Sequence, residues 1–281
     1  MEIIITLVIV AMLLYYFNNY TYAVKEIKVA SSDVPKGFHG YRILHISDLH
    51  NSCYGEGNQK LIRKIIKLNP DVIFYTGDMI DKQSPGKDHF RMLIEGIAHK
   101  YPSYFADGNH EDELSKEEKK ELISVLDGSG IRYIDDEKLS LERDENQITL
   151  YGLRLPRKYL RNTYDENGKI GLRKEELIKR IGKIENGFTM LLAHNPLYFD
   201  VYAEYGINLT FSGHVHGGVV RLPLLGGILS PDRTFFPKYS KGLYVKEDKK
   251  IVVSPGIGGI KLRFFNRPTM YVVKLQRKET L

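Results

Sequence analysis

Short apolar runs alternate with longer amphipathic runs through most of the sequence, and this alternation constrains the fold more than any other feature. In the first half, strand-like and helix-like runs follow one another at residues 41–47, 58–70, 71–77, 89–99, 103–108 and 115–130. The last of these begins with Ser115 and Glu118, the spacing of a capping box. Alternating strands and helices predict a layered α/β domain.

The second half is richer in strands. Its strand-like runs occupy residues 147–154, 188–194, 207–213, 250–256 and 270–275. Helical spacing is clear at residues 172–182 and weaker at residues 197–205. We therefore expect two sheets packed as a sandwich, with helices on the outer faces.

Five of the predicted strands end in side chains that can ligate a metal. These side chains are Asp48 and His50, Asp78, Asn109 and His110, His194, and His214 and His216. Each one alone is also typical of an ordinary turn or of a structural strand-end residue. In open α/β sheets, however, ligands bind outside the carboxyl ends of the strands. Together these residues predict one site, and His39, His45, His89 and His99 are read as structural or surface residues.

The donor set indicates which metals the site would take. Histidine, aspartate and asparagine without a thiolate suit Mn, Fe or Zn. The candidates are too many for one open site, and Asp78 has two carboxylate oxygens with which to bridge two ions. Two metals about 4 Å apart would clamp the oxygens of a phosphoryl displacement and lower the pKa of a bridging water.

The ordered motifs DLH, GD, GNHE, H and GHVH resemble those of the calcineurin-like metallophosphoesterase superfamily, over residues 41–275. The resemblance implies a four-layer α/β/β/α sandwich with a dinuclear site at the strand ends. It implies that the first metal is held by Asp48, His50, Asp78 and His216. It implies that the second is held by Asp78, Asn109, His194 and His214. His110 would stabilise the transition state or protonate the leaving alkoxide.

Differences from the motifs of individual branches indicate which branch of the superfamily the sequence resembles. Protein serine/threonine phosphatases carry an arginine just before GNHE, where this chain has Asp107, and purple acid phosphatases carry a tyrosine ligand where this chain has Asp81. The sequence is most similar to a small membrane-associated bacterial branch. That branch implies a phosphodiesterase that uses a two-metal-activated hydroxide at a membrane surface. The alternative within it is a pyrophosphohydrolase of a UDP-2,3-diacylglucosamine-like nucleotide lipid.

A third alternative is a non-catalytic scaffold on the same fold. Scaffolds of this kind lose metal ligands, and this chain has lost none of those considered. Two apolar stretches, residues 221–230 and 234–239, could line a groove for a lipid, although core packing is the commoner role. The basic residues 156–161 could likewise face an anionic substrate, or form a solvated surface.

The N-terminus differs from the rest of the chain. Residues 3–17 are uncharged and almost entirely apolar, and the run extended to residue 24 supplies the ~20 residues that span a bilayer. Glu2 and the absence of an A-x-A site favour an uncleaved membrane anchor over a signal peptide. Lysines after the segment place the domain on the cytoplasmic side. We expect an anchor at residues 1–24, a linker at 25–40 and the catalytic domain at 41–281.

Composition adds limits on partners. The 281 residues carry a formal net charge of +6, which favours anionic partners such as phosphate esters or acidic lipid. No block of like charge indicates a nucleic-acid-binding arm, and no feature indicates an oligomeric state. Cys53 is the only cysteine, so an intrachain disulfide and a metal site of the zinc-finger type, which needs several thiolates, are both excluded.

Overall fold

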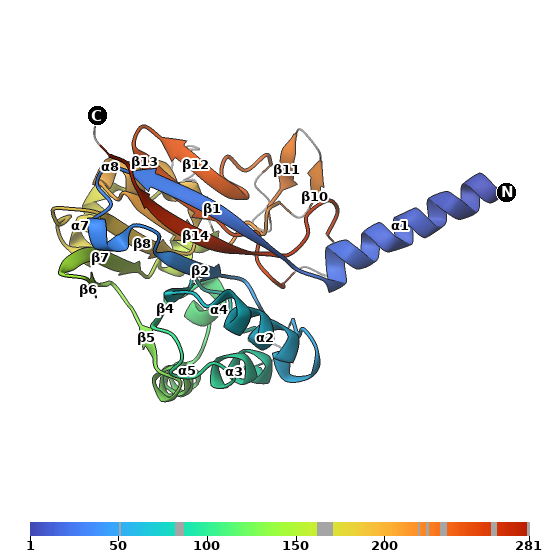
Figure 1. The fold of residues 1–281 in the computed structure, drawn as a ribbon, viewed down its shortest axis with the longest axis horizontal. Helices are drawn as coiled ribbons and strands as arrows, with labels where there is room; N and C mark the ends of the chain where they lie inside the picture. Colours follow the sequence, from blue (N-terminus) through green and yellow to red (C-terminus); the bar gives the residue numbers. More distant parts are fainter. Residues whose placement is uncertain are drawn as a thin grey trace.

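The computed structural model describes residues 1–50, 52–81, 87–161, 171–218, 220–222, 225–230, 235–259 and 263–279. Two six-stranded sheets form the centre of the molecule (Figure 1). The first sheet has the order β1 (Ala23–Ser31), β14 (Thr269–Arg277), β2 (Arg42–Ile46), β3 (Val72–Tyr75), β4 (Ser103–Phe105) and β5 (Ile131–Tyr133). The second has the order β12 (Gly242–Lys246), β13 (Lys249–Val253), β9 (Leu209–Ser212), β8 (Thr189–Ala193), β7 (Asn146–Leu153) and β6 (Glu137–Arg143).

The central strands of both sheets run parallel. In the first sheet β2, β3, β4 and β5 are parallel, and β14 is antiparallel to β2. In the second sheet β7, β8, β9 and β13 are parallel, whereas the edge strands β6 and β12 are antiparallel to their neighbours. Parallel strands place their carboxyl ends at one edge, which is the arrangement a strand-end site requires.

The two sheets pack face to face between two layers of helices. The first layer contains α2 (Gln59–Leu68), α3 (Lys87–Glu95) and α5 (Lys116–Gly128), and the second contains α7 (Lys174–Ile181) and α8 (Phe199–Tyr205). On β2, Ile43 belongs to the core between the sheets and Leu44 to the core under the first helical layer. Strands buried on both faces read as continuous apolar runs. The four-layer α/β/β/α sandwich is therefore confirmed.

Short elements complete the chain. They are α4 (Asn109–Asp112), α6 (Arg157–Arg161), η1 (Lys36–Phe38), η2 (Glu56–Asn58), η3 (Pro196–Tyr198) and a hairpin of β10 (Val220–Leu222) and β11 (Gly226–Leu229). The predicted capping box is present at α5. There the Glu118 N–H donates to Ser115 Oγ over 3.2 Å, and the Ser115 N–H donates to Glu118 Oε2 over 2.9 Å.

The prediction of a linker at residues 25–40 is wrong for its first part. β1 pairs in parallel with β14 from Ala23 to Ser31, so the first sheet begins about 18 residues before residue 41 (41 − 23 = 18). The sequence pattern does not predict β1, because this strand lies at a sheet edge, buries only Val29 fully and leaves charged side chains exposed. The same reason applies to β6 and β12, which are largely exposed edge strands.

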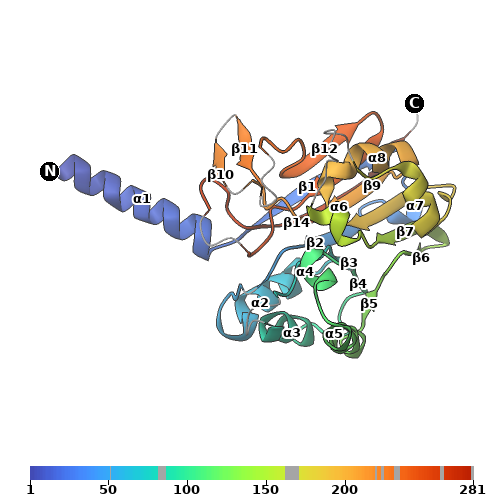
Figure 2. The same cartoon turned by 180° about the vertical axis from the view of Figure 1, so that it is seen from behind.

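The predicted N-terminal segment forms one helix, α1 (Glu2–Tyr20), which projects from the domain (Figures 1 and 2). It has a mean hydropathy of 1.8 and no buried part, so by length and composition it can cross a membrane. Its last turn is joined to the domain. Asn19 Oδ1 accepts the Arg263 backbone N–H over 2.7 Å, and Arg267 Nε donates to Thr21 Oγ1 over 2.9 Å.

Candidate metal centre

The predicted site residues meet where the carboxyl ends of the two sheets face each other. Asp48 follows β2 in the first sheet, and His194 and His214 follow β8 and β9 in the second. Contacts between the sheets hold them in place. The backbone N–H of His214 donates to Asp48 Oδ1 over 3.1 Å, and His194 Nδ1 lies 2.5 Å from the carbonyl oxygen of Thr76.

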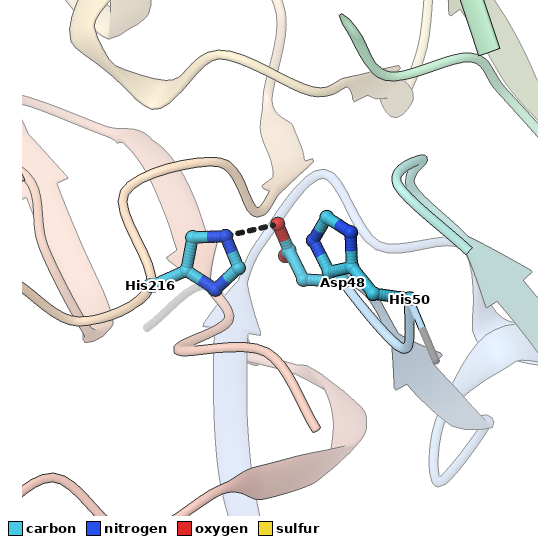
Figure 3. Close-up of side chains that lie close together, drawn as sticks. All are labelled: Asp48, His50 and His216. Atoms are coloured by element: carbon cyan, nitrogen blue, oxygen red, sulfur yellow. Dashed lines mark ion pairs between the residues drawn. The ribbon is translucent and has the colours of Figure 1, made fainter. Parts of the chain in front are cut away.

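The side chains form three overlapping groups: two that share no residue, described in turn below, and a third of His50, Asp78 and His110 that links them. In the first group, Asp48, His50 and His216 bring one potential ligand atom each to within 4.8 Å of one another. His216 Nε2 lies 3.5 Å from Asp48 Oδ1, although the two residues come from different sheets (Figure 3). The rings of His50 and His216 stack with centroids 5.3 Å apart.

The second group contains Asp78, His194 and His214 under the same distance limit. Asn109 adjoins it, because Asn109 Oδ1 lies 2.9 Å from His214 Nδ1. Asp78 faces both groups through one oxygen. Its Oδ2 is 3.1 Å from His194 Nε2 and 4.0 Å from His50 Nε2. Asp78 thus lies between the two groups, and its bridging role and the ligand assignment stay predictions.

The buried polar atoms of the first group fit a divalent cation. Asp48 Oδ2, both ring nitrogens of His50 and Nδ1 of His216 are buried and have no hydrogen-bond partner within the described ranges. Such atoms are costly in a protein interior unless a partner satisfies them. Oxygen and imidazole nitrogen donors in this geometry suit the borderline metals that the sequence predicts.

Burial also sets the charge of the site. It lowers the pKa of His50 to about 4 and lowers the pKa of His216 well below its usual range, so both rings are neutral at pH 7, as metal ligation requires. Burial raises the pKa of Asp48 to about 6. Burial opposes protonation of His194, but the adjacent Asp78 carboxylate outweighs it and raises the His194 pKa to about 10. Without a metal, a proton on His194 compensates Asp78.

The backbone at the site is held in an unusual conformation. Asp48, His50, Asp78, His214 and His216 all have positive φ angles between 48° and 70°. Non-glycine residues seldom adopt this left-handed region, at a cost of about 1–3 kcal/mol each, and such residues cluster at functional sites. Five candidate ligands in this region indicate that tertiary contacts impose the geometry.

Glycines allow the closest approaches. A Cβ on Gly213 would lie 2.0 Å from Ser47 Oγ and 2.2 Å from Asp48 Oδ2. A Cβ on Gly259 would lie 2.4 Å from His50 Cδ2 and 2.6 Å from His216 Cε1. The absence of a side chain at these positions therefore lets the two sheets bring their candidate ligands together.

Two buried residues that the sequence did not single out position the candidate ligands. The Glu111 carboxylate accepts backbone N–H groups from Asp78, Met79 and Gly108 over 2.7, 2.8 and 2.9 Å. Asn266 Nδ2 donates to the carbonyl oxygens of His216 and Gly218 over 2.5 and 3.0 Å.

A local signal exists for Glu111, because a glutamate three residues after Gly108 stands at the N3 position of a helix. No local signal exists for Asn266, whose partners lie about 50 residues earlier in the chain.

His110 is more accessible than the buried candidate ligands. Its side chain is 29% exposed, whereas the Asp78 side chain is 3% exposed. Its Nδ1 lies 3.6 Å from Asp81 Oδ1, and its Nε2 lies 4.0 Å from Asp78 Oδ2. The ring is thus placed at the mouth of the centre, with one nitrogen toward a carboxylate and the other toward the candidate ligands.

This constellation agrees with the comparison to known families. The model of the family described as calcineurin-like phosphoesterase matches residues 41–218. The chain belongs to the calcineurin-like phosphoesterase family. The resemblance drawn from the sequence motifs is confirmed, and the chain is a metallophosphoesterase. The family typically binds two metal ions, in agreement with the two groups of side chains.

Several relatives of this calcineurin-like chain have assigned names. Phosphodiesterase YaeI of Escherichia coli is 25% identical over 241 residues, covering 84% of this chain and 82% of that protein. UDP-2,3-diacylglucosamine pyrophosphatase LpxG of Chlamydia muridarum is 25% identical over 292 residues, covering 86% of each. A Danio rerio transmembrane protein with a metallophosphoesterase domain is 29% identical over 269 residues, covering 90% of this chain and 57% of that protein.

Proposed function

We propose that this metallophosphoesterase hydrolyses phosphodiester bonds at a membrane surface with two bound divalent cations. The observation that carries the proposal is the position of Asp78, whose Oδ2 faces a histidine of each group. Two cations at such a site neutralise the charge of a phosphate ester and lower the pKa of water between them. Similarity to a named phosphodiesterase supports the substrate class.

The proposed ligands follow the two groups. Asp48, His50 and His216, with Asp78, would hold the first ion, and Asn109, His194 and His214, with Asp78, would hold the second. Every member of both groups except Asn109 is at least 94% buried, which supports a role in holding ions for both groups alike. Glu111 would fix the backbone of the Asp78 loop, which accords with the general importance of residues that orient metal ligands.

His110 would act on the substrate instead of on a metal. Asp81 lies near its Nδ1, which leaves Nε2 facing the centre. A proton held on Nε2 would stabilise the phosphoryl oxygens or pass to the leaving alkoxide. The accessibility of this ring supports the role, since a group that contacts substrate must be reachable.

The membrane location rests on α1. This helix is long and apolar enough to cross a membrane, and a transmembrane protein is among the relatives. We propose that α1 is a single-pass anchor with the domain on the cytoplasmic side, since Lys25 and Lys28 directly follow it. Membrane fractionation tests the anchor, and protease protection of sealed cells tests the side. A chain released by alkaline carbonate, or a mature chain that begins after α1, would contradict the anchor.

A second candidate is the hydrolysis of the pyrophosphate of a nucleotide lipid. Exposed apolar side chains around β10 and β11 favour this candidate, because they could contact a lipid. The hairpin lies near the centre, since Gly218, two residues after His216, packs against Gly227 of the hairpin. Similarity to UDP-2,3-diacylglucosamine pyrophosphatases also favours it. This substrate would use the same metal centre.

A substrate panel tests both candidates. The purified chain, stripped of metal and reloaded with Mn, Fe or Zn, is assayed on bis-p-nitrophenyl phosphate, p-nitrophenyl phosphate and UDP-2,3-diacylglucosamine. The main proposal expects the diester to have the highest kcat/KM. The second candidate expects the nucleotide lipid to exceed it. Preference for the monoester would contradict both.

A further inference from the structure

Six of the exposed large apolar residues outside α1 lie on the β10–β11 hairpin or in the segments next to it. We define the apolar rim as Leu222, Leu225, Phe235, Phe236, Phe264 and Phe265. Their exposed fractions range from 37% to 70%. Within the described ranges, every exposed phenylalanine beyond α1 belongs to this rim. Scattered single apolar residues are normal on a protein surface, whereas a contiguous cluster marks an interaction surface.

The segments of the rim are neighbours in space. β10 pairs with β11 as an antiparallel hairpin. On one side of this hairpin, Val220 forms a bridge with Phe264, and on the other side Leu229 forms a bridge with Phe235. Residue 264, the hairpin and residue 235 therefore lie side by side.

Backbone strain accompanies two of the exposed rings. Phe236 and Phe265 have φ angles of 48° and 49°. A bulky residue in the left-handed region is an outlier, and it persists only where the surrounding structure imposes it. The loops thus hold large apolar side chains in solvent despite a conformational cost.

The rim is continuous with the base of α1. The last turn of α1 binds the residue before Phe264, because the Asn19 side chain accepts the N–H of Arg263 over 2.7 Å and donates to its carbonyl oxygen over 3.3 Å. Both views show the hairpin on the side of the domain from which α1 projects (Figures 1 and 2). A bilayer crossed by α1 would therefore lie against this side.

Cations surround the rim. Arg221 lies in β10 of the hairpin, Lys241 lies near it, and Arg267 lies at the base of α1. None of the three forms an ion pair with a carboxylate in the part of the chain that the structure describes. Burial, and after it the nearby charges of Lys25 and Arg221, lower the pKa of Lys241 to about 7. Such a surface attracts anionic lipid.

We propose that the apolar rim rests in the headgroup region of an anionic lipid bilayer and sets the metal centre at the bilayer surface. This inference rests on the proposed function, in which α1 is the anchor. Apolar and aromatic side chains flanked by cations are the features of interfacial membrane binding. The rim lies beside the centre because Asn266, two residues after Phe264, holds the His216 loop.

The chain lacks tryptophan, so single substitutions report their own environment. Full-length Phe235→Trp and Phe264→Trp are reconstituted in phosphatidylcholine vesicles with phosphatidylglycerol. Ile178→Trp is the control, because this residue is 41% exposed on α7, at the end of the domain away from α1. The rim probes should show blue-shifted emission and quenching by brominated acyl chains, more strongly with phosphatidylglycerol than without it. The control should show neither effect.

Flotation of the same samples separates the two proposals. If the chain floats with vesicles but the rim probes match the Ile178→Trp control, the rim inference is wrong and the anchor stands. If the chain does not float, both are wrong. A blue shift that rises with protein concentration in detergent, without quenching by brominated lipid, would indicate a second copy of the chain and contradict the bilayer. Unchanged turnover of a soluble diester verifies that each variant folds.

Discussion

Replacing Gly213 by alanine is expected to damage the metal centre without removing any proposed ligand. The new Cβ would lie 2.0 Å from Ser47 Oγ and 2.2 Å from Asp48 Oδ2. Ordinary non-bonded contacts are about 3.5–4.0 Å, so these atoms must separate by roughly 1.5 Å. Ser47 and Asp48 are both fully buried, and neither offers a long flexible side chain that could swing away.

The expected effects of Gly213→Ala have two causes. The added carbon crowds the packed interior, and it displaces the Asp48 side chain. Forcing an extra carbon into a packed interior costs about 1–3 kcal/mol. In a chain of this size each kcal/mol lowers Tm by about 2–4 °C, so we expect a decrease of roughly 2–12 °C. Displacing a group at a reacting centre by about 1 Å reduces the rate by about 10²-fold. Activity should therefore fall further than stability alone explains.

The assay combines kcat on bis-p-nitrophenyl phosphate, metal content and thermal unfolding. Gly128→Ala is the matched control, because no atom lies within 4 Å of the Cβ it would add at the end of α5. The control should retain activity, metal and Tm. If Gly213→Ala also retains all three, then the tight contact with Asp48 does not hold the ligand, and the reasoning is wrong.

Three further outcomes are expected. His110→Asn should keep its metals and lose about 10²–10⁴ in kcat, with a smaller loss on p-nitrophenyl esters, whose leaving group scarcely needs a proton. An equal loss of kcat on substrates with good and with poor leaving groups would argue against the acid role. Glu111→Gln should weaken metal affinity by about 10–100-fold. The amide has only one oxygen, so it cannot accept all the backbone N–H groups of Asp78, Met79 and Gly108 that the carboxylate now accepts. If a metal titration shows that Glu111→Gln keeps the wild-type affinity, Glu111 does not position the metal ligands. Burial lowers the pKa of His45 to about 3, so protonation of the unfolded state should reduce stability as the pH falls below 6.5. Between pH 7.5 and 5.0 the wild type should lose about 2 kcal/mol more than His45→Gln in urea unfolding, and parallel curves would show that His45 is not responsible.

The sequence predicts the centre of the fold better than its edges. β2, β3, β8 and β9 are buried on both faces and therefore stand out as apolar runs. β1 lacks that pattern because only Val29 is fully buried. Its place in the sheet depends on pairing with β14, nearly 250 residues later, which no local pattern encodes.

The same distinction applies to the metal centre. The candidate ligands are visible because each follows an apolar strand, and the parallel sheets then bring them to one place. Asn266 acts through the carbonyl oxygens of a distant loop, so only the folded chain reveals it. The left-handed backbone at Asp48 and His216 is likewise a product of tertiary contacts and could not be predicted from these residues.

The most direct test of the two-metal account is the metal content of the purified wild type and of Asp78→Asn, measured by elemental analysis beside activity. The account predicts two ions per chain in the wild type. In Asp78→Asn it predicts well under two ions with loss of turnover, because the carboxylate that faces both groups has lost its charge. Two retained ions and full activity in Asp78→Asn would contradict the bridge and, with it, the proposed mechanism.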